Sequence, residues 1–222
     1  TYGLMSNFSF YYAHHMSTIE GGMVSTDDDD LAEWLRIIRG HGLARESSVA
    51  MNTRLVENNK YLRLNNDFIF VRSGYNVRST EVNAVIGRSQ LKTLDARNEI
   101  RRSNMNMFFA NLDKNKFVTD LNTDGCFSYA LTPILRSPDI KLGDKVETLL
   151  HDHGVEFRRG LSGGGSQVRQ PYIIDYLTRR RKWNPKEFPN TEHIHFYAWY
   201  IGNYPDLEQW KILELCRLLN EA

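Results

Sequence analysis

The sequence predicts a mixed α/β fold. We expect residues 1–100 to form the remainder of a large α/β domain with a long connecting helix, and residues 101–222 to form a small α+β domain. Apolar residues alternate in the first segment, recur every three or four residues in later segments, and gather in short strand-like runs between them. With 222 residues, 41% hydrophobic and 25% charged, the chain can bury a substantial core.

The first elements are a strand and a helix. Phe8, Phe10 and Tyr12 alternate with their neighbours, which predicts a strand within residues 1–12. The four aspartates at 27–30 then precede apolar residues at helical spacing over 31–38. Acidic residues are favourable at the positive end of a helix dipole, so we expect a helix here that ends at the following glycine.

A polar connection separates this helix from the next one. Residues 46–73 are rich in asparagine and end in a strand-like run at 68–71. A helical pattern then begins near residue 79 and extends towards residue 109. We therefore expect one long helix to lead into the second domain.

The second domain alternates strands with helices. The pattern predicts a buried strand over 127–135, a helix over 143–153, and a strand over 155–158. A glycine-rich loop is expected at 160–165. The apolar spacing at 205–219 predicts a final helix.

Three motifs occur in the order found in one enzyme family. They are Ser9-Phe10-Tyr11-Tyr12-Ala13-His14-His15 with Glu20-Gly21-Gly22, then Arg39-Gly40-His41-Gly42, then Gly74-Tyr75-Asn76-Val77-Arg78. Together they resemble the DegT/DnrJ/EryC1/StrS family of vitamin-B6-dependent enzymes, which act on nucleotide-linked keto sugars. The resemblance implies the C-terminal portion of a fold-type I PLP-dependent transferase. Family members carry an N-terminal half with the aromatic residue that stacks on the cofactor and the aspartate that pairs with its ring nitrogen, so this chain alone is expected to be inactive.

Position 14 is where this chain departs from the aminotransferases of the family. There a phosphate-binding serine stands five residues before the Schiff-base lysine, whereas here Ser9 plus five is His14. Imidazole cannot hold the cofactor covalently as an amine does, but its unperturbed pKa of about 6.5, against about 10.4 for lysine, lets it take and give protons near neutral pH. The change resembles the GDP-4-keto-6-deoxymannose 3-dehydratase branch. It implies His14 as the catalytic acid and base, with pyridoxamine 5'-phosphate or pyridoxal 5'-phosphate as cofactor; His15 is the alternative base.

The resemblance implies four further site residues. Asn76 matches the asparagine that reaches the cofactor phosphate of the partner subunit, which implies a homodimer; the alternative is a turn residue. His41 and Arg45 match positions near the substrate. Arg158 matches a site where an arginine meets a diphosphate through paired N–H donors. For these three residues, the alternative is a surface or capping role.

Other classes of function are less well supported. A net charge of +1 gives no overall field for nucleic acid, and the basic run at 179–182 has no interleaved aromatic residues. No apolar run reaches the roughly 20 residues of a membrane span, and no signal peptide is evident, so we expect a cytoplasmic protein. The His-x-His pairs at 151–153 and 193–195 could lie on strand faces, but they lack further ligands for a metal. Cys126 and Cys216 are too few for the iron–sulfur cluster of a related branch.

The resemblance therefore implies a dehydratase that removes the C3 hydroxyl of a nucleotide-linked 4-keto-6-deoxy sugar, with L-glutamate as the amino donor. Two alternatives stay open. The first is a sugar aminotransferase relative of the same family. The second is a non-catalytic fragment that mediates dimerisation or binds a sugar nucleotide, because half of the residues expected to surround the cofactor are absent. The residues do not specify the nucleotide or the hexose.

Overall fold

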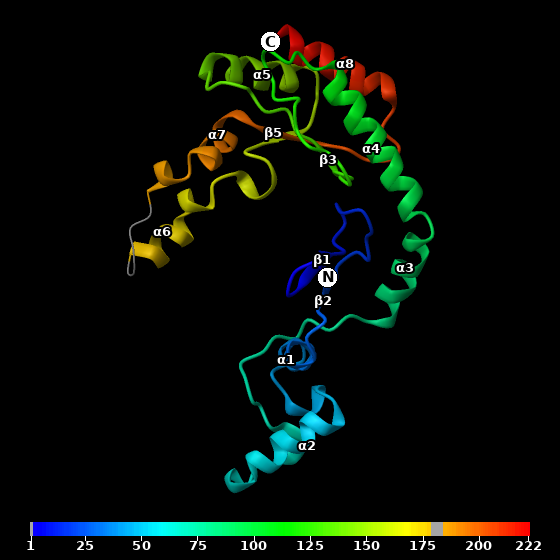
Figure 1. Cartoon of the computed structure of the whole chain (residues 1–222), viewed down its shortest axis with the longest axis vertical. Helices are drawn as coiled ribbons and strands as arrows, with labels where there is room; N and C mark the ends of the chain where they lie inside the picture. Colours follow the sequence, from blue (N-terminus) through cyan, green and yellow to red (C-terminus); the bar gives the residue numbers. More distant parts are fainter. Residues whose placement is uncertain (1, 179–183) are drawn as a thin grey trace. The chain divides into compact units, whose positions relative to one another are not determined.

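The computed structural model describes residues 2–178 and 184–222 and consists of two compact units, Thr1–Leu94 and Asp95–Ala222 (Figure 1). Within the described residues, each unit has its own antiparallel sheet, with two strands in the first and three in the second. The basic run predicted at 179–182 lies outside the described residues.

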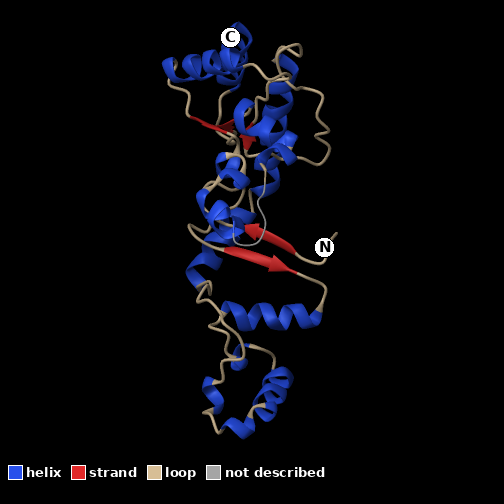
Figure 2. Ribbon diagram, turned by 90° about the vertical axis from the view of Figure 1, so that its left-hand side faces the viewer, coloured by secondary structure: helices blue, strands red, loops and turns tan. Residues whose placement is uncertain are grey.

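The first unit begins with a β-hairpin (Figure 2). Strand β1 (Ser6–Ser9) pairs with β2 (Gly22–Ser25), and Ser9 lies opposite Gly22. Residues 10–21 form the connecting loop. The strand predicted within residues 1–12 is therefore shorter than its apolar alternation indicated, because the chain turns just after Ser9.

Three helices follow in the first unit: α1 (Asp29–Arg39), α2 (Val49–Asn58) and α3 (Glu81–Leu91). Helix α1 starts as predicted, since the Asp28 carboxylate accepts the N–H of Leu31 at 2.9 Å. Helix α2 lies in the segment predicted to be a polar connection. Its start is capped by Ser48, whose hydroxyl accepts the N–H of Met51 at 3.3 Å.

The second unit combines helices with a three-stranded sheet. Its helices are α4 (Leu94–Asn111, starting at the last residue of the first unit), α5 (Ile140–Asp152), α6 (Pro171–Thr178), α7 (Pro189–Tyr197) and α8 (Gln209–Glu221). Its strands are β3 (Ala130–Leu131), β4 (Phe157–Arg159) and β5 (Trp199–Gly202). The strand order is β3-β5-β4, and both pairs are antiparallel.

One face of this sheet packs against α4, α5 and α8. Trp199 and Ile201 of β5 belong to the same buried cluster as Phe108 of α4 and Leu150 of α5. The apolar face predicted for the last helix is buried in this cluster, through Ile212, Leu215, Cys216 and Leu219. The core of the second unit therefore lies between the sheet and these three helices.

Several sequence predictions differ from the structure. The long helix predicted from 79 to 109 is interrupted between α3 and α4, where Thr93 bonds back to Gln90 and ends α3 in a tight turn. The strand-like run at 68–71 forms only one bridge, between Phe70 and Leu43. The strand predicted over 127–135 is reduced to β3 and two isolated bridges that follow it, at Ile134 and Leu135.

The prediction that His193 and His195 lie on one strand face is wrong, because both belong to helix α7. Pro189 opens this helix, and its fixed φ favours the first helical turn. Residues two apart on a helix do not face each other. Accordingly, a ring nitrogen of His193 contacts the carbonyl of Leu135, whereas Nδ1 of His195 accepts the N–H of Ser166.

Candidate active site

Ser9 and His14 lie around one tight turn at the end of β1. The Ser9 hydroxyl oxygen accepts the N–H of Tyr11 at 3.3 Å, and the carbonyl of Tyr11 accepts the N–H of His14 at 3.1 Å. The five-residue spacing therefore brings both residues to the same backbone turn. Ser9 is exposed and uses its oxygen as an acceptor here, so its O–H remains able to donate to an anionic group.

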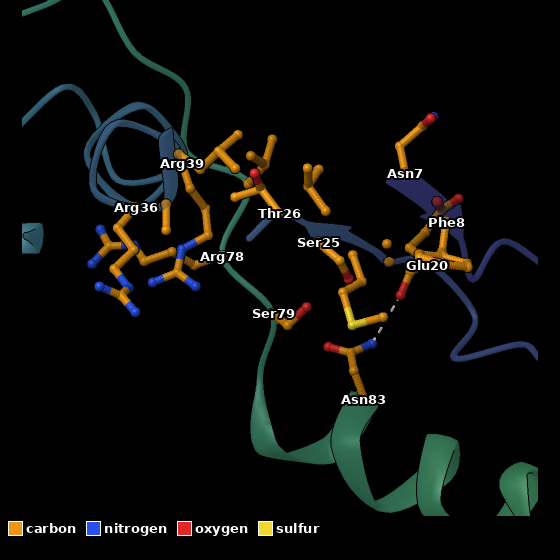
Figure 3. Close-up of a pocket in the computed structure, with 17 residues that line it drawn as sticks. Asn7, Phe8, Glu20, Ser25, Thr26, Arg36, Arg39, Arg78, Ser79 and Asn83 are labelled. Carbon is orange, nitrogen blue, oxygen red and sulfur yellow. Dashed lines mark hydrogen bonds between the residues drawn. The ribbon is translucent and has the colours of Figure 1, made fainter. Parts of the chain in front are cut away.

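The loop that carries His14 is tied to helix α3. The side-chain amide of Asn83 donates to the carbonyls of Thr18 and Glu20, at 2.9 and 3.2 Å, and Figure 3 shows the bond to Glu20. The other end of the same amide caps α3, because its oxygen accepts the N–H of Thr80 at 3.1 Å. Sequence reasoning missed Asn83. The Thr-x-x-Asn spacing at a helix start was the only local signal.

The turn that contains His41 crosses the segment that contains Asn76. The N–H of His41 donates to the carbonyl of Tyr75 at 2.7 Å. A side chain at Gly74 would overlap the backbone nitrogen of Gly42, and one at Gly42 would overlap a backbone carbonyl oxygen of the crossing segment. His41 itself has a φ of 67°, in the left-handed region. The two glycines thus allow a close backbone crossing that sets His41 beside Asn76.

Asn76 and Arg45 make local contacts near this crossing. The Asn76 side-chain oxygen accepts a bond from Arg78 Nε at 3.4 Å, and Arg78 also forms an ion pair with Glu46 at 3.3 Å. The Arg45 guanidinium lies over the ring of Phe68, 4.8 Å from its centroid. The structure thus brings Asn76, His41 and Arg45 into neighbouring segments. In the described part of the chain, none of these three side chains hydrogen-bonds to Ser9 or His14.

A groove of about 1130 Å³ lies between the hairpin, α1 and residues 77–83 of the first unit. Arg36, Arg39 and Arg78 gather on its α1 side, and Asn83 lies on its α3 side (Figure 3). The lining also includes apolar residues of the hairpin. None of the site residues predicted from the sequence belongs to the lining of this groove, although Arg78 lies two positions after Asn76.

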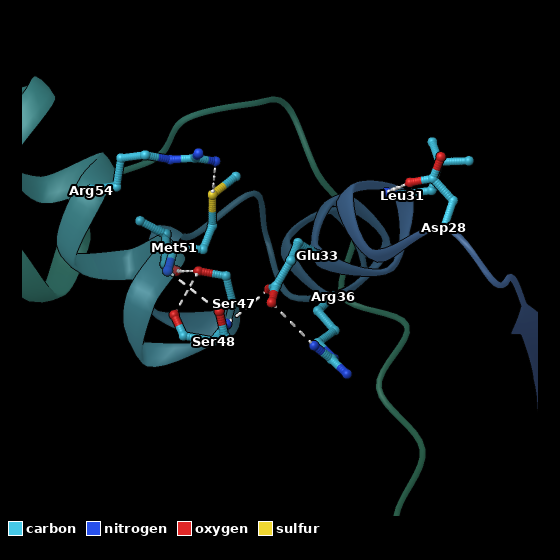
Figure 4. A network of polar contacts seen from close by, with 9 residues as sticks. Asp28, Leu31, Glu33, Arg36, Ser47, Ser48, Met51 and Arg54 are labelled. Carbon is cyan, nitrogen blue, oxygen red and sulfur yellow. Dashed lines mark hydrogen bonds and ion pairs between the residues drawn. The ribbon is translucent and has the colours of Figure 1, made fainter.

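Glu33 connects α1 to the start of α2 (Figure 4). Its carboxylate accepts the N–H of Ser48 at 2.8 Å and lies 3.5 Å from the guanidinium of Arg36. The bond from the Ser48 backbone, more than the charge of Arg36, holds the pKa of Glu33 below its usual value. The positive charge of Arg36 at the groove is therefore partly neutralised by the ionised Glu33.

In the second unit, two adjacent arginines of β4 have different surroundings. Arg159 binds Glu147 through Nε and Nη2, at 2.5 and 2.6 Å, and Trp199 Nε1 donates to the same carboxylate at 2.8 Å. Arg158 is exposed and lies over the ring of Tyr200. Within the described residues it makes no salt bridge. Of the two, Arg158 is thus the one available to an anionic ligand.

The Glu147 carboxyl is influenced by two opposing effects. Burial acts to raise its pKa, but the hydrogen bonds from Arg159 and Trp199, together with the positive charge of Arg159, outweigh burial. The net result is a pKa below the usual value. Glu147 is therefore ionised at neutral pH and engages Arg159 as part of the structure.

The described residues contain no group of three or more histidine, cysteine, aspartate or glutamate side chains arranged to hold a metal. They also contain no helix with the length and apolar character needed to cross a bilayer. Both cysteines are free thiols. Burial raises the pKa of Cys216 to about 12, so this thiol is not a reactive thiolate at neutral pH.

The architecture matches about half of a PLP-dependent aminotransferase fold. A solved structure of the Escherichia coli GDP-4-keto-6-deoxy-D-mannose-3-dehydratase with bound hydrated PLP aligns with a TM-score of 0.74 and 25% identity. The alignment covers 99% of this chain and 55% of that one. The predicted fold class is therefore confirmed.

A sequence profile of the DegT/DnrJ/EryC1/StrS aminotransferase family matches residues 1–219, and the chain belongs to this family. The GDP-4-keto-6-deoxy-D-mannose 3-dehydratase of Escherichia coli O55:H7 is 40% identical over 211 residues, which cover 92% of this chain and 51% of that protein. The UDP-4-amino-4,6-dideoxy-N-acetyl-beta-L-altrosamine transaminase of Campylobacter jejuni serotype O:2 is 28% identical over 151 residues, covering 66% and 36%. The chain spans about half the length or less of these curated relatives.

Proposed function

We propose that this chain is part of a pyridoxamine- or pyridoxal-phosphate-dependent nucleotide-sugar 3-dehydratase. The observation that carries the proposal is the hairpin turn that places a histidine, His14, five residues after Ser9. The hairpin contains no lysine, because the lysines of the first unit are Lys60 and Lys92. The 40% identity to a named 3-dehydratase supports the same reaction.

The residues present suit the phosphate of such a cofactor. Ser9 has an exposed hydroxyl whose hydrogen can be donated to a phosphate oxygen. Asn76 would donate its side-chain amide to the phosphate held by the partner subunit, which makes a homodimer part of the proposal. When bound, the cofactor supplies the electron-accepting ring on which an elimination next to a keto group depends.

His14 would move the protons of the reaction. Its imidazole would take the proton released from the C4' carbon of the bound cofactor, and it would give a proton to the C3 hydroxyl oxygen as that group leaves as water. One group can do both because imidazole exchanges protons readily near neutral pH. His14 is half-buried, and its backbone N–H donates to the carbonyl of Tyr11 in the turn that follows Ser9.

The substrate in this proposal is a nucleotide-linked 4-keto-6-deoxy sugar, with L-glutamate as the amino donor. Arg158 would contact the diphosphate, since it is exposed and has no carboxylate partner in the described residues. His41 and Arg45 would contact the sugar nucleotide from the first unit. His41 lies in the turn after α1, and Arg45 lies in the short helical turn that follows at Ala44–Glu46. Their closeness in the chain supports a shared role in binding the sugar nucleotide.

Replacing His14 tests the proposal in the full-length protein. With a 4-keto-6-deoxy nucleotide sugar, pyridoxamine phosphate and glutamate, mass spectrometry should show that His14→Asn lowers formation of the 3-deoxy product by about 100-fold or more. His14→Lys should lose the 3-deoxy product to a similar extent, while its amine binds pyridoxal phosphate covalently and gives a new absorbance band. His15→Asn serves as the matched control. A His14→Lys protein that forms the 3-deoxy product at the parental rate would contradict the proposed role.

A sugar aminotransferase is the second candidate, and the transaminase relative from Campylobacter jejuni favours it. The two reactions differ in their products. An aminotransferase makes a 4-amino sugar with all other hydroxyl groups retained, whereas a dehydratase loses the C3 hydroxyl. The mass of the product from the parental protein therefore discriminates between them before any variant is made.

A further inference from the structure

The face of the second unit's sheet opposite the buried core carries three contacting side chains. Arg158 and Tyr200 are direct partners across β4 and β5, and the guanidinium carbon lies 5.7 Å from the ring centroid. The ring of Tyr129 meets that of Tyr200 edge-on, with centroids 5.8 Å apart and planes at 62°. Trp199 and Ile201, the neighbours of Tyr200 in β5, point into the core instead.

The neighbouring arginine shows why this contact is informative. Arg159 is oriented by two hydrogen bonds to Glu147, so its guanidinium is committed to the structure. Arg158 is exposed, and among the described residues its guanidinium is held by the ring of Tyr200 rather than by a carboxylate. A ring restricts the plane of a guanidinium without neutralising its charge or occupying its N–H donors. Arg158 therefore keeps both for a ligand.

The Tyr200 phenol is neutral at physiological pH, and its surroundings favour that form further. Burial of the phenol and the nearby Tyr129 raise the pKa of Tyr200, and they outweigh the opposite effect of Arg158. A neutral ring offers its face to a cation through its quadrupole, whereas a phenolate would pair with the cation through its oxygen. The contact observed over the ring agrees with the neutral form.

We infer that Tyr200 is a positioning residue: its ring orients Arg158 so that the free N–H donors meet the diphosphate of the sugar nucleotide, and Tyr129 braces the ring. The inference rests on the proposed function, because it takes a nucleoside diphosphate as the ligand. Charge complementarity supports this ligand, since an arginine fork matches paired phosphate oxygens. Orienting the side chain beforehand reduces the entropy lost on binding.

Binding of GDP to the full-length protein, measured by titration calorimetry, tests the inference without requiring turnover. Two variants without an aromatic ring, Tyr200→Leu and Tyr200→Met, should raise the Kd for GDP by about three- to tenfold. Tyr200→Phe keeps the aromatic ring, so its Kd for GDP should stay within about twofold of the parental value. Arg158→Gln should weaken binding at least as much, and adding Tyr200→Leu to it should have little further effect. Tyr204→Leu, at an exposed tyrosine that is not one of the three contacting side chains, is the control.

Kinetics give a second readout. With the sugar nucleotide as substrate, the ringless variants should raise KM more than they lower kcat, because Tyr200 does not touch the reacting atoms. If Arg158→Gln weakens GDP binding but neither ringless variant does, the positioning role of Tyr200 is refuted while the proposed function stands. If Arg158→Gln also binds GDP normally, Arg158 is not a diphosphate ligand and the inference fails with it. The product assay on His14 variants then still reports independently on the reaction.

Discussion

The two units of this chain differ in how far they bury their own apolar side chains. Among the described residues, the buried hydrophobic residues of the first unit are Ile37, Leu43, Ala44, Met51 and Ile69, and all the others lie in the second unit. The second unit packs its sheet against three helices. The first unit instead exposes apolar side chains on both strands of its hairpin and along α3, including Phe8, Met23, Val24, Val82 and Val85.

This difference separates the residues expected to act on the cofactor from the part of the chain with a complete core. Ser9, His14 and Asn76 all belong to the first unit, whereas Arg158 belongs to the second. Exposed apolar patches are typical of regions that contact another molecule. We therefore expect the second unit to be stable by its own packing, and the conformation of the first unit to depend more on contacts beyond its own residues.

The largest effect should come from removing the centre of the second core. Trp199 is fully buried, and Trp199→Ala should lower the free energy of unfolding of the second unit by about 3–5 kcal/mol. Chemical denaturation followed by circular dichroism measures this change. Trp210→Ala is the matched control, because Trp210 on α8 is 60% exposed. Equal losses for the two variants would mean that the second unit has no independently stabilising core.

An intermediate effect is expected at Glu147, which joins α5 to the sheet. Glu147→Gln should destabilise the second unit by about 1–3 kcal/mol at pH 7, because Arg159 loses its charged partner. The pKa of Glu147 is lowered by folding, so its contribution is present above the unfolded carboxyl value near 4.3 and is lost as the pH falls through the lower folded value.

The pH dependence distinguishes this effect from a packing defect. Denaturation midpoints of the parental protein and Glu147→Gln should differ at pH 7 and converge in acid. Glu214→Gln provides a control, since Glu214 forms an exposed pair with Arg217 on α8 and should change the midpoints little. A difference that stays constant from pH 7 to pH 3 would show that the ionised carboxylate is not what stabilises the fold.

The smallest expected loss of stability comes from removing a helix cap, and the two units contain equivalent caps that can be compared. Asp28 accepts the N–H of Leu31 at the start of α1, and Asp139 accepts the N–H of Leu142 at the start of α5. Loss of such a cap costs about 1 kcal/mol. Asp139→Ala should lower the cooperative stability of the second unit, whereas Asp28→Ala should accelerate hydrogen exchange only in α1. If both variants shift one common unfolding transition equally, the two units do not differ in the way proposed.

Local signals in the sequence account for much of the fold. Helices α1, α5 and α8 each have an apolar periodicity, and the structure contains all three. Helix α1 starts within the predicted run of aspartates, α5 begins three residues before the predicted 143, and α8 begins at Gln209 rather than at the predicted residue 205. Helix α2 was missed because the asparagine-rich composition of residues 46–73 was interpreted as a connection, and Met51 is the only buried residue of this helix. A local signal for its start was Ser48, whose hydroxyl caps the helix.

The candidate site was predictable only where it is local. Ser9 and His14 are five positions apart and lie in successive turns of the chain at the end of β1, which a motif can specify. By contrast, Asn83 holds the His14 loop from more than sixty residues away in sequence, and Arg158 differs from Arg159 only because of partners on other elements. Periodicity and composition contain no information about such contacts, because they depend on how elements pack.

The crossing of Gly42 and Gly74 limits how this part of the protein can vary. A side chain on either residue would overlap backbone atoms of the opposite segment, which cannot adopt another rotamer to make room. Neither residue has a side chain that could be reduced to compensate for growth at the other. A larger residue at one of these positions therefore cannot be accommodated by a substitution at the other. The relative placement of His41 and Asn76 can drift only through changes in the loops outside the crossing.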